Sequence, residues 1–141
     1  MKESIIILDG IDRSGKTSLK NELIKQSNGK CLVIDRAFIS QIVYNRIFKR
    51  EINETFFKNQ ATYCFRLGYK FVYLYANKND IKYRVRNTNE KDISEKDINT
   101  HKKIFDSVIK EFEKLNIKIY KYNTSLYTVD GLVKKIFNNI E

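Results

Sequence analysis

Residues 10–17 read GIDRSGKT and match the pattern G-x-x-x-x-G-K-[ST] at every fixed position. Each fixed residue has a chemical task in a loop that holds phosphates. Gly10 and Gly15 let successive backbone N–H groups curl around one phosphate, and Lys16 directs a positive charge toward the β- and γ-phosphates. The Thr17 hydroxyl is a ligand for Mg²⁺. The segment therefore predicts a site for ATP and Mg²⁺, with the loop contacts Gly10, Asp12, Arg13, Ser14, Gly15, Lys16 and Thr17.

The segments on either side of this loop support the assignment. Residues 4–8 form a continuous aliphatic run, which is typical of a central parallel strand buried on both faces. After the loop, Leu19, Leu23 and Ile24 recur at helical spacing, and Gly29 provides a stop. The pattern thus stands where a strand passes into a helix, as a phosphate-binding loop requires.

Further apolar segments alternate between strand and helix periodicity. Predicted strands cover residues 31–34, ending at Asp35, then 71–75, and then 117–122, the last nearer an edge because Lys118 and Lys121 interrupt it. Helices are predicted through 42–47 with Ser40 as the cap, through 56–65 up to Gly68, through 98–115 after a capping box of Ser94 and Asp97, and through 132–140. The aromatic residues at 56–65 and 104–112 are interpreted as core.

This alternation predicts one α/β domain over residues 1–141, a P-loop NTPase-type parallel β-sheet of about four strands with helices on both faces. Ligands bind at the carboxyl ends of such strands. The rule places the 10–17 loop, the Asp35-Arg36 pair and the segment after Ala76 on one rim.

Two groups of charged residues could act with the loop at this rim. Asp35 ends a strand at the point from which a carboxylate holds Mg²⁺ through water, and the neighbouring Arg36 can stabilise a phosphoryl group in transfer. Arg84 and Arg86 lie in a polar segment after the third strand that suits a lid, and Arg84 is a further predicted ATP contact. The alternative for that segment is a solvated charged helix.

Charge and composition limit the partners. The net charge of +10 fits either nucleic-acid binding or an AT-rich coding bias. The lysines are scattered along the chain and not grouped in a stripe, so charge alone does not decide between the two. No apolar run is long enough to span a bilayer, and residues 1–3 lead directly into the first strand, so we expect a cytoplasmic protein. Cys31 and Cys64 lack metal-ligand spacing, with His101 as the one histidine, and are interpreted as buried free thiols.

The loop, together with residues 35–44 (DRAFISQIVY), resembles the corresponding motifs of thymidylate kinases, most closely those of short phage-type members. The lid segment, the following helix and the terminal strand and helix also fall in the family's order. The resemblance implies transfer of the ATP γ-phosphoryl group to a deoxynucleoside monophosphate such as dTMP, or to a nucleoside. Family members are often dimers, so the resemblance leaves a homodimer open.

The resemblance also implies roles for individual residues. Asp12 would contact the sugar 3′-hydroxyl of the acceptor, and Arg13 matches a loop arginine used in catalysis. Arg36 would hold the phosphates at the transfer point, with Asp35 in the magnesium shell. The acceptor would lie near Ser40 and Tyr44, and the lid arginines Arg84 and Arg86 would reach the ATP phosphates.

One departure from the family keeps two other functions open. Asp35 follows Thr17 by 18 positions, where the family usually inserts a strand and helices that grip the acceptor base. Either residues from 44–65 replace that wall, or the site admits a larger acceptor. The alternatives are therefore a kinase acting on a nucleic-acid end or modified base, and a non-catalytic nucleotide-binding module.

Overall fold

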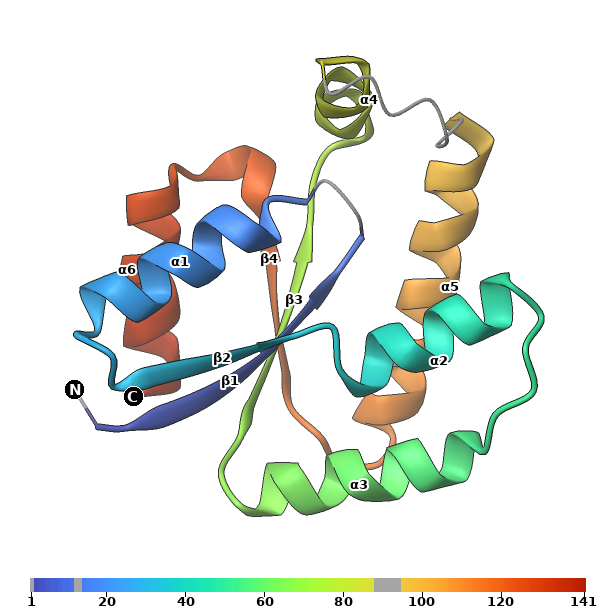
Figure 1. Cartoon of the computed structure of the whole chain (residues 1–141), viewed down its shortest axis with the longest axis horizontal. Coiled ribbons are helices and arrows are strands. Elements are labelled where there is room, and N and C mark those ends of the chain that lie inside the picture. Colours follow the sequence, from blue (N-terminus) through green and yellow to red (C-terminus); the bar gives the residue numbers. More distant parts are fainter. Residues whose placement is uncertain (1, 12–13, 88–94) are drawn as a thin grey trace.

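A sheet of four parallel strands in the order β2-β1-β3-β4 forms the centre of the protein. The computed structural model describes residues 2–11, 14–87 and 95–141. The strands are β1 (Ser4–Gly10), β2 (Cys31–Asp35), β3 (Lys70–Tyr75) and β4 (Ile119–Asn123). β1, which leads into the phosphate-binding loop, is an interior strand with a partner on each side (Figure 1). The predicted α/β fold with a four-stranded parallel sheet is confirmed.

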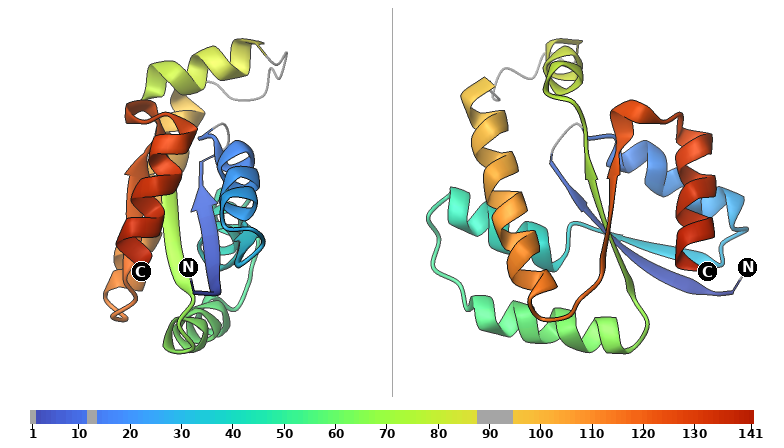
Figure 2. Two further views of the ribbon diagram at one scale, coloured as in Figure 1. Left: turned by 90° about the vertical axis from the view of Figure 1, so that its left-hand side faces the viewer. Right: turned by 180° about the vertical axis from the view of Figure 1, so that it is seen from behind.

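Helices cover both faces of this sheet (Figure 2). They are α1 (Lys16–Gln26), α2 (Phe38–Ile47), α3 (Glu54–Arg66), α4 (Lys78–Asn87), α5 (Glu95–Glu113) and α6 (Val129–Ile140), with a short 3₁₀ turn, η1 (Thr124–Leu126). α1 and α6 pack on one face, and α2, α3 and α5 pack on the other. α4 lies beyond the carboxyl end of β3 (Figure 1).

The aliphatic run in β1 contributes to two separate cores. Ile6 and Leu8 belong to the core under α1 and α6, whereas Ile7 belongs to the core under α2, α3 and α5. Successive side chains of a strand point to opposite faces, so a strand covered on both faces must be apolar at every position. All three side chains are at most 1% exposed. This burial holds β1 and the start of the loop in a fixed position.

Several predicted boundaries were wrong by a few residues. β1 continues to Gly10, and β4 begins at Ile119 instead of residue 117. The late start of β4 has a local cause, because Asn116 adopts a left-handed φ of 65° and the Ile117 N–H donates to the Phe112 carbonyl, 3.4 Å away. Residues 116–117 therefore close α5 before the strand can begin.

Other predictions about individual side chains had mixed outcomes. Ser40 is not the cap of α2, because the helix begins at Phe38 and Ala37 occupies the capping position. Ser94 of the predicted capping box lies outside the described residues. Phe56 is 52% exposed and therefore not part of the core, whereas Phe105 and Phe112 are fully buried. Both cysteines are free thiols, Cys31 buried and Cys64 half-buried.

An ionic network joins α2, α3 and α5, the three helices on one face of the sheet. Arg46 of α2 donates to both carboxylate oxygens of Glu54 and to both of Glu111, at 2.7–3.0 Å. Lys58 of α3 adds a contact of 2.8 Å to Glu111. These hydrogen bonds, those from Arg46 first, lower the pKa of Glu111 to about 2. The network fixes α2 against α3 and α5.

In the part of the chain that the structure describes, no helix combines the length and the apolar character that crossing a bilayer requires.

Candidate active site

The phosphate-binding loop runs from the end of β1 to the start of α1, where the motif requires it. Gly15 immediately precedes α1 with a left-handed φ of 93°, a conformation that favours glycine. Gly10 has a different reason to be glycine, because a Cβ there would lie 2.4 Å from the backbone oxygen of Leu74 in β3. Both motif glycines are thus required by the backbone.

Lys16, the first residue of α1, points back into its own loop. Its Nζ donates to the carbonyl oxygens of Gly10 at 2.8 Å and Ile11 at 2.9 Å, and the residue is only 6% exposed. The ammonium group therefore lies beside the first turn of α1, where N–H groups and the helix dipole also attract anions. Ser14 is buried next to it. Charge and N–H groups together make this position suited to bind phosphate.

Asp35 and Arg36 meet the loop from the neighbouring strand. Asp35, the last residue of β2, pairs in register with Leu8, and the Arg36 N–H donates to the Leu8 carbonyl at 3.0 Å. β2 therefore ends two residues short of Gly10, at the same rim. Arg36 has a left-handed φ of 55°, which is unusual for a residue with a side chain and is commonly found at functional sites.

Asp35 has an available carboxylate oxygen. Its Oδ1 is buried and has no hydrogen-bond partner in residues 2–11, 14–87 and 95–141. A buried carboxylate oxygen in that state carries an unbalanced desolvation cost, which a cation nearby would offset. With the Thr17 hydroxyl at the start of α1, the donor set is the oxygen-only kind that Mg²⁺ prefers. The residues present fit the predicted ion.

Comparison with solved structures places this geometry in a known fold. The YorR protein from Bacillus subtilis, solved in complex with phosphorylated GDP, superposes with a TM-score of 0.78 at 22% identity over 97% of this chain and 95% of that chain. Deoxyadenosine kinase from M. mycoides with bound dCTP gives 0.64 at 11% identity, over 96% and 98%. Thymidylate kinase from Candida albicans gives 0.59 at 11% identity, over 99% and 91%. The chain has the P-loop nucleotide kinase fold.

The sequence comparisons found no match, either to a protein-family model or to a curated protein. The predicted resemblance to thymidylate kinases is therefore confirmed as one of fold, and the phage-type subgroup stays a prediction. Within the P-loop kinase fold, the described part of the site joins Gly10, Ser14, Gly15, Lys16, Thr17, Asp35 and Arg36 at one rim. Asp12 and Arg13 lie outside the described residues, as do the side chains of Arg84 and Arg86.

Tyr44 of α2 connects Arg36 to α5. The Arg36 guanidinium lies 5.7 Å from the centre of the Tyr44 ring, a cation–π distance. The Tyr44 ring also packs edge-on against His101 and Phe105 of α5, with distances between ring centroids of 6.1 and 5.9 Å. Sequence analysis missed His101 and Phe105 as supports of the site, because Tyr44 lies at least 57 residues away from them along the sequence.

A buried carboxylate that sequence analysis missed fixes the start of α2. Asp9, 1% exposed, accepts hydrogen bonds from the backbone N–H of Ser40 at 3.2 Å and from its hydroxyl at 2.5 Å. Ala37 has no side chain that could cap α2, so Asp9 supplies the missing acceptor from β1. Burial raises the pKa of the Asp9 carboxyl, and the Ser40 bonds oppose that shift. Ser40 therefore positions α2 beside the loop.

The carboxyl ends of β3 and β4 are joined by a second polar cluster. The Asn77 N–H donates to Ser125 Oγ at 2.8 Å, and Asn123 Nδ2 donates to Asn77 Oδ1 at 3.0 Å. Thr124 Oγ1 adds a contact of 3.2 Å to the Tyr75 carbonyl. These bonds fix the residues from which α4 begins, and α4 carries Arg84 and Arg86 in its last turns. The described part of the predicted lid segment, which ends at Asn87, is thus a helix that begins at the rim.

Proposed function

We propose that the protein is an ATP-dependent kinase that transfers the γ-phosphoryl group to a deoxynucleoside monophosphate of the dTMP type, or to a nucleoside. The observation that carries this proposal is the placement of Lys16 and of the Asp35-Arg36 pair at one rim of the sheet. A module that only binds nucleotide needs the loop. It does not need a second strand that ends in a carboxylate and an arginine beside that loop.

In the proposed reaction an acceptor oxygen attacks the γ-phosphorus in line, and the bond from that phosphorus to the β,γ-bridging oxygen breaks. Lys16 neutralises charge that moves onto the β-phosphate, and Arg36 stabilises the phosphoryl group in transfer. We assign the same task to Arg13, Arg84 and Arg86 from the sequence. The predicted acceptor contacts are Asp12, Ser40 and Tyr44.

Mg²⁺ would be held by Thr17 directly and by Asp35 through water. When bound, the ion would neutralise negative charge on the phosphates. The chain's own contribution is to fix the two oxygen ligands on adjacent elements, α1 and β2. The buried Asp35 Oδ1 supports this assignment.

The acceptor class is supported by the resemblance and by the ligands of proteins with the same fold. YorR was solved with phosphorylated GDP, and deoxyadenosine kinase was solved with dCTP. A different observation favours a larger acceptor: α1 passes into β2 through residues 27–30 alone, so this part of the chain builds no wall around an acceptor base. A nucleic-acid end or modified base is therefore the second candidate.

The test is Mg²⁺-dependent transfer from labelled ATP to a panel of dTMP, dUMP, other deoxynucleoside monophosphates, thymidine and DNA. We expect label on one small acceptor, and loss of turnover by about 1000-fold in Lys16→Ala with the fold retained. Label on DNA alone would establish the second candidate. ATP binding without transfer to any acceptor would leave the non-catalytic module, and full activity of Lys16→Ala would reject the loop assignment.

A homodimer stays a prediction of the resemblance. α3 exposes Phe56 and Tyr63, at 52% and 65%, and Leu67 follows the helix at 58%. Apolar side chains grouped on one helix are the surface on which a second copy would be expected. Sedimentation equilibrium of the wild type and of Tyr63→Glu measures this directly.

A further inference from the structure

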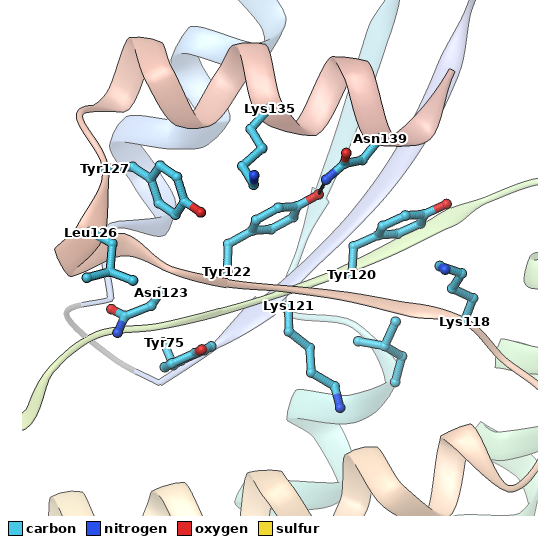
Figure 3. Close-up of a pocket in the computed structure, with 11 residues that line it drawn as sticks. Tyr75, Lys118, Tyr120, Lys121, Tyr122, Asn123, Leu126, Tyr127, Lys135 and Asn139 are labelled. Atoms are coloured by element: carbon cyan, nitrogen blue, oxygen red, sulfur yellow. Dashed lines mark hydrogen bonds between the residues drawn. The ribbon is translucent and has the colours of Figure 1, made fainter.

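A groove on the outer edge of the sheet lies apart from the phosphate-binding loop. The groove runs beside β4, which is an edge strand of the sheet, and is bordered by η1 and α6. Its volume is about 350 Å³. Lys118 and Tyr127 stand at opposite ends of the residues that line it, so the groove runs along the strand (Figure 3).

The groove is positively charged. Lys118, Lys121 and Lys135 line it, and no acidic side chain does so among the described residues. Lys121 points to the other side of β4 from Tyr122, Tyr127 and Lys135 (Figure 3), so Lys118 and Lys135 are the lysines beside the tyrosine rings. Lys121 also contacts Glu113 at 3.0 Å, but both side chains are more than 40% exposed, so this pair contributes little and can exchange. In a chain with a net charge of +10, this edge attracts anions.

Tyrosine rings alternate with these lysines. Lys118 Nζ lies 5.2 Å from the Tyr120 ring centre, and Lys135 Nζ lies 5.7 Å from that of Tyr127. The third ring, Tyr122, is 4% exposed and is fixed by a bond of 2.8 Å from Asn139 Nδ2 to its hydroxyl. Tyr127 is 37% exposed and therefore has surface available for contact.

We propose that this groove binds single-stranded nucleic acid. A nucleotide presents a planar base and an anionic phosphate a sugar apart, and the groove pairs a tyrosine ring with a lysine tip at each end. Stacking on aromatic rings and salt bridges to phosphates are the two contacts by which proteins hold unpaired strands. An acidic peptide would use the lysines alone, and a duplex keeps its bases stacked on one another.

The site does not depend on phosphoryl transfer, so its test needs no ATP. Fluorescence anisotropy of the full chain is measured with labelled oligo(dT) and oligo(U) of about 12 nucleotides, between about 50 and 200 mM salt. With Lys118 and Lys135 on phosphates, the slope of log K against log salt is expected to be about −1.4. Comparing the two oligomers distinguishes a DNA site from an RNA site.

Variants distinguish binding in this groove from attraction by the net charge of the protein. Lys118→Gln/Lys135→Gln should reduce the magnitude of the slope by about 1.4, because each phosphate contact contributes about 0.7. Tyr127→Leu should weaken binding about tenfold and leave the slope unchanged. The matched control, Lys30→Gln/Lys103→Gln, removes the same charge from exposed residues outside the groove and should keep the wild-type slope. Circular dichroism melts verify that each variant folds.

Three results would overturn the proposal. The first is an equal change of slope in the control pair, which would mean that net charge alone attracts the strand. The second is wild-type affinity in Tyr127→Leu. The third is a duplex or a polyglutamate peptide binding as tightly as the oligomer at equal concentration of anionic groups.

Discussion

Asp9 of β1 and Ser40 of α2 share one carboxylate oxygen: Asp9 Oδ1 accepts from both the backbone N–H and the hydroxyl of Ser40. The contact joins the residue before the phosphate-binding loop to the helix that carries Tyr44. Because Ser40 is itself only 2% exposed, neither of its donors can turn to water when the carboxylate is lost.

Two substitutions of Asp9 should therefore separate the contribution of its hydrogen bonds from that of its negative charge. We expect Asp9→Ala to lower the free energy of unfolding by about 1–3 kcal/mol, because α2 loses its acceptor, and Asp9→Asn to lower it less, because the amide oxygen still accepts. Urea denaturation measures both. Equal loss in the two variants would mean that packing, and not the hydrogen bonds, explains the effect.

The raised pKa of Asp9 has a consequence for pH. The folded protein binds the Asp9 proton more tightly than the unfolded chain, so this group lowers stability as pH rises above about 4. The wild type should lose more stability than Asp9→Asn between about pH 4 and pH 7. Urea midpoints at a series of pH values test this, and parallel curves would contradict it.

Glu111 should act in the opposite direction. Its pKa is lowered to about 2, first by hydrogen bonds from Arg46, so its contribution is complete above about pH 4.5 and is lost as pH falls toward 2. Glu111→Gln should thus lose less stability on acidification from pH 5 to pH 2 than the wild type does. Asp130→Asn, a change to an exposed carboxylate on α6, serves as the control.

Gly10→Ala tests how closely the loop approaches β3. The new Cβ would meet the Leu74 backbone oxygen at 2.4 Å, and a backbone atom in the centre of a sheet cannot move aside cheaply. We expect loss of ATP binding together with lower stability. Gly131→Ala is the comparison, since its Cβ would meet only the Thr128 hydroxyl at 3.1 Å, and a calorimetric titration with ATP should leave that variant unchanged.

Arg36 has a proposed catalytic role and also an unusual backbone conformation. Arg36→Ala should lower kcat by about 100-fold or more with little change in KM, because the guanidinium is assigned to the transfer step. Arg36→Gly should be equally slow but more stable than Arg36→Ala by about 1 kcal/mol, because glycine accepts the positive φ of 55°. A rise in KM at constant kcat would instead make Arg36 a substrate-binding residue.

Sequence analysis predicted the parts of the site that depend on neighbours along the chain. The loop is local, and Asp35-Arg36 follows an aliphatic strand whose partner could be inferred, so the placement of Lys16 and this pair at one rim was expected. Asp9 was missed because its role depends on Ser40, 31 residues away. A signal was present, since an acid next to Leu8 in a strand buried on both faces needs a partner.

The helix–helix contacts could not be predicted in the same way. Tyr44 was assigned to the acceptor, but its edge-on neighbours His101 and Phe105 depend on how α2 packs against α5. The periodicity of α5 indicates which of its residues are buried. It does not indicate which residues of another helix they meet.

The interior position of β1 has a consequence for local opening. Its amides pair with β2 or β3, whereas β2 and β4 each have one free edge in the sheet. Amides of Ile6, Ile7 and Leu8 should exchange with deuterium only when the whole domain unfolds, and those of the outer strands earlier. The strand that leads into the phosphate-binding loop would then open later than the outer strands, so the loop keeps its base while the edges of the sheet fluctuate.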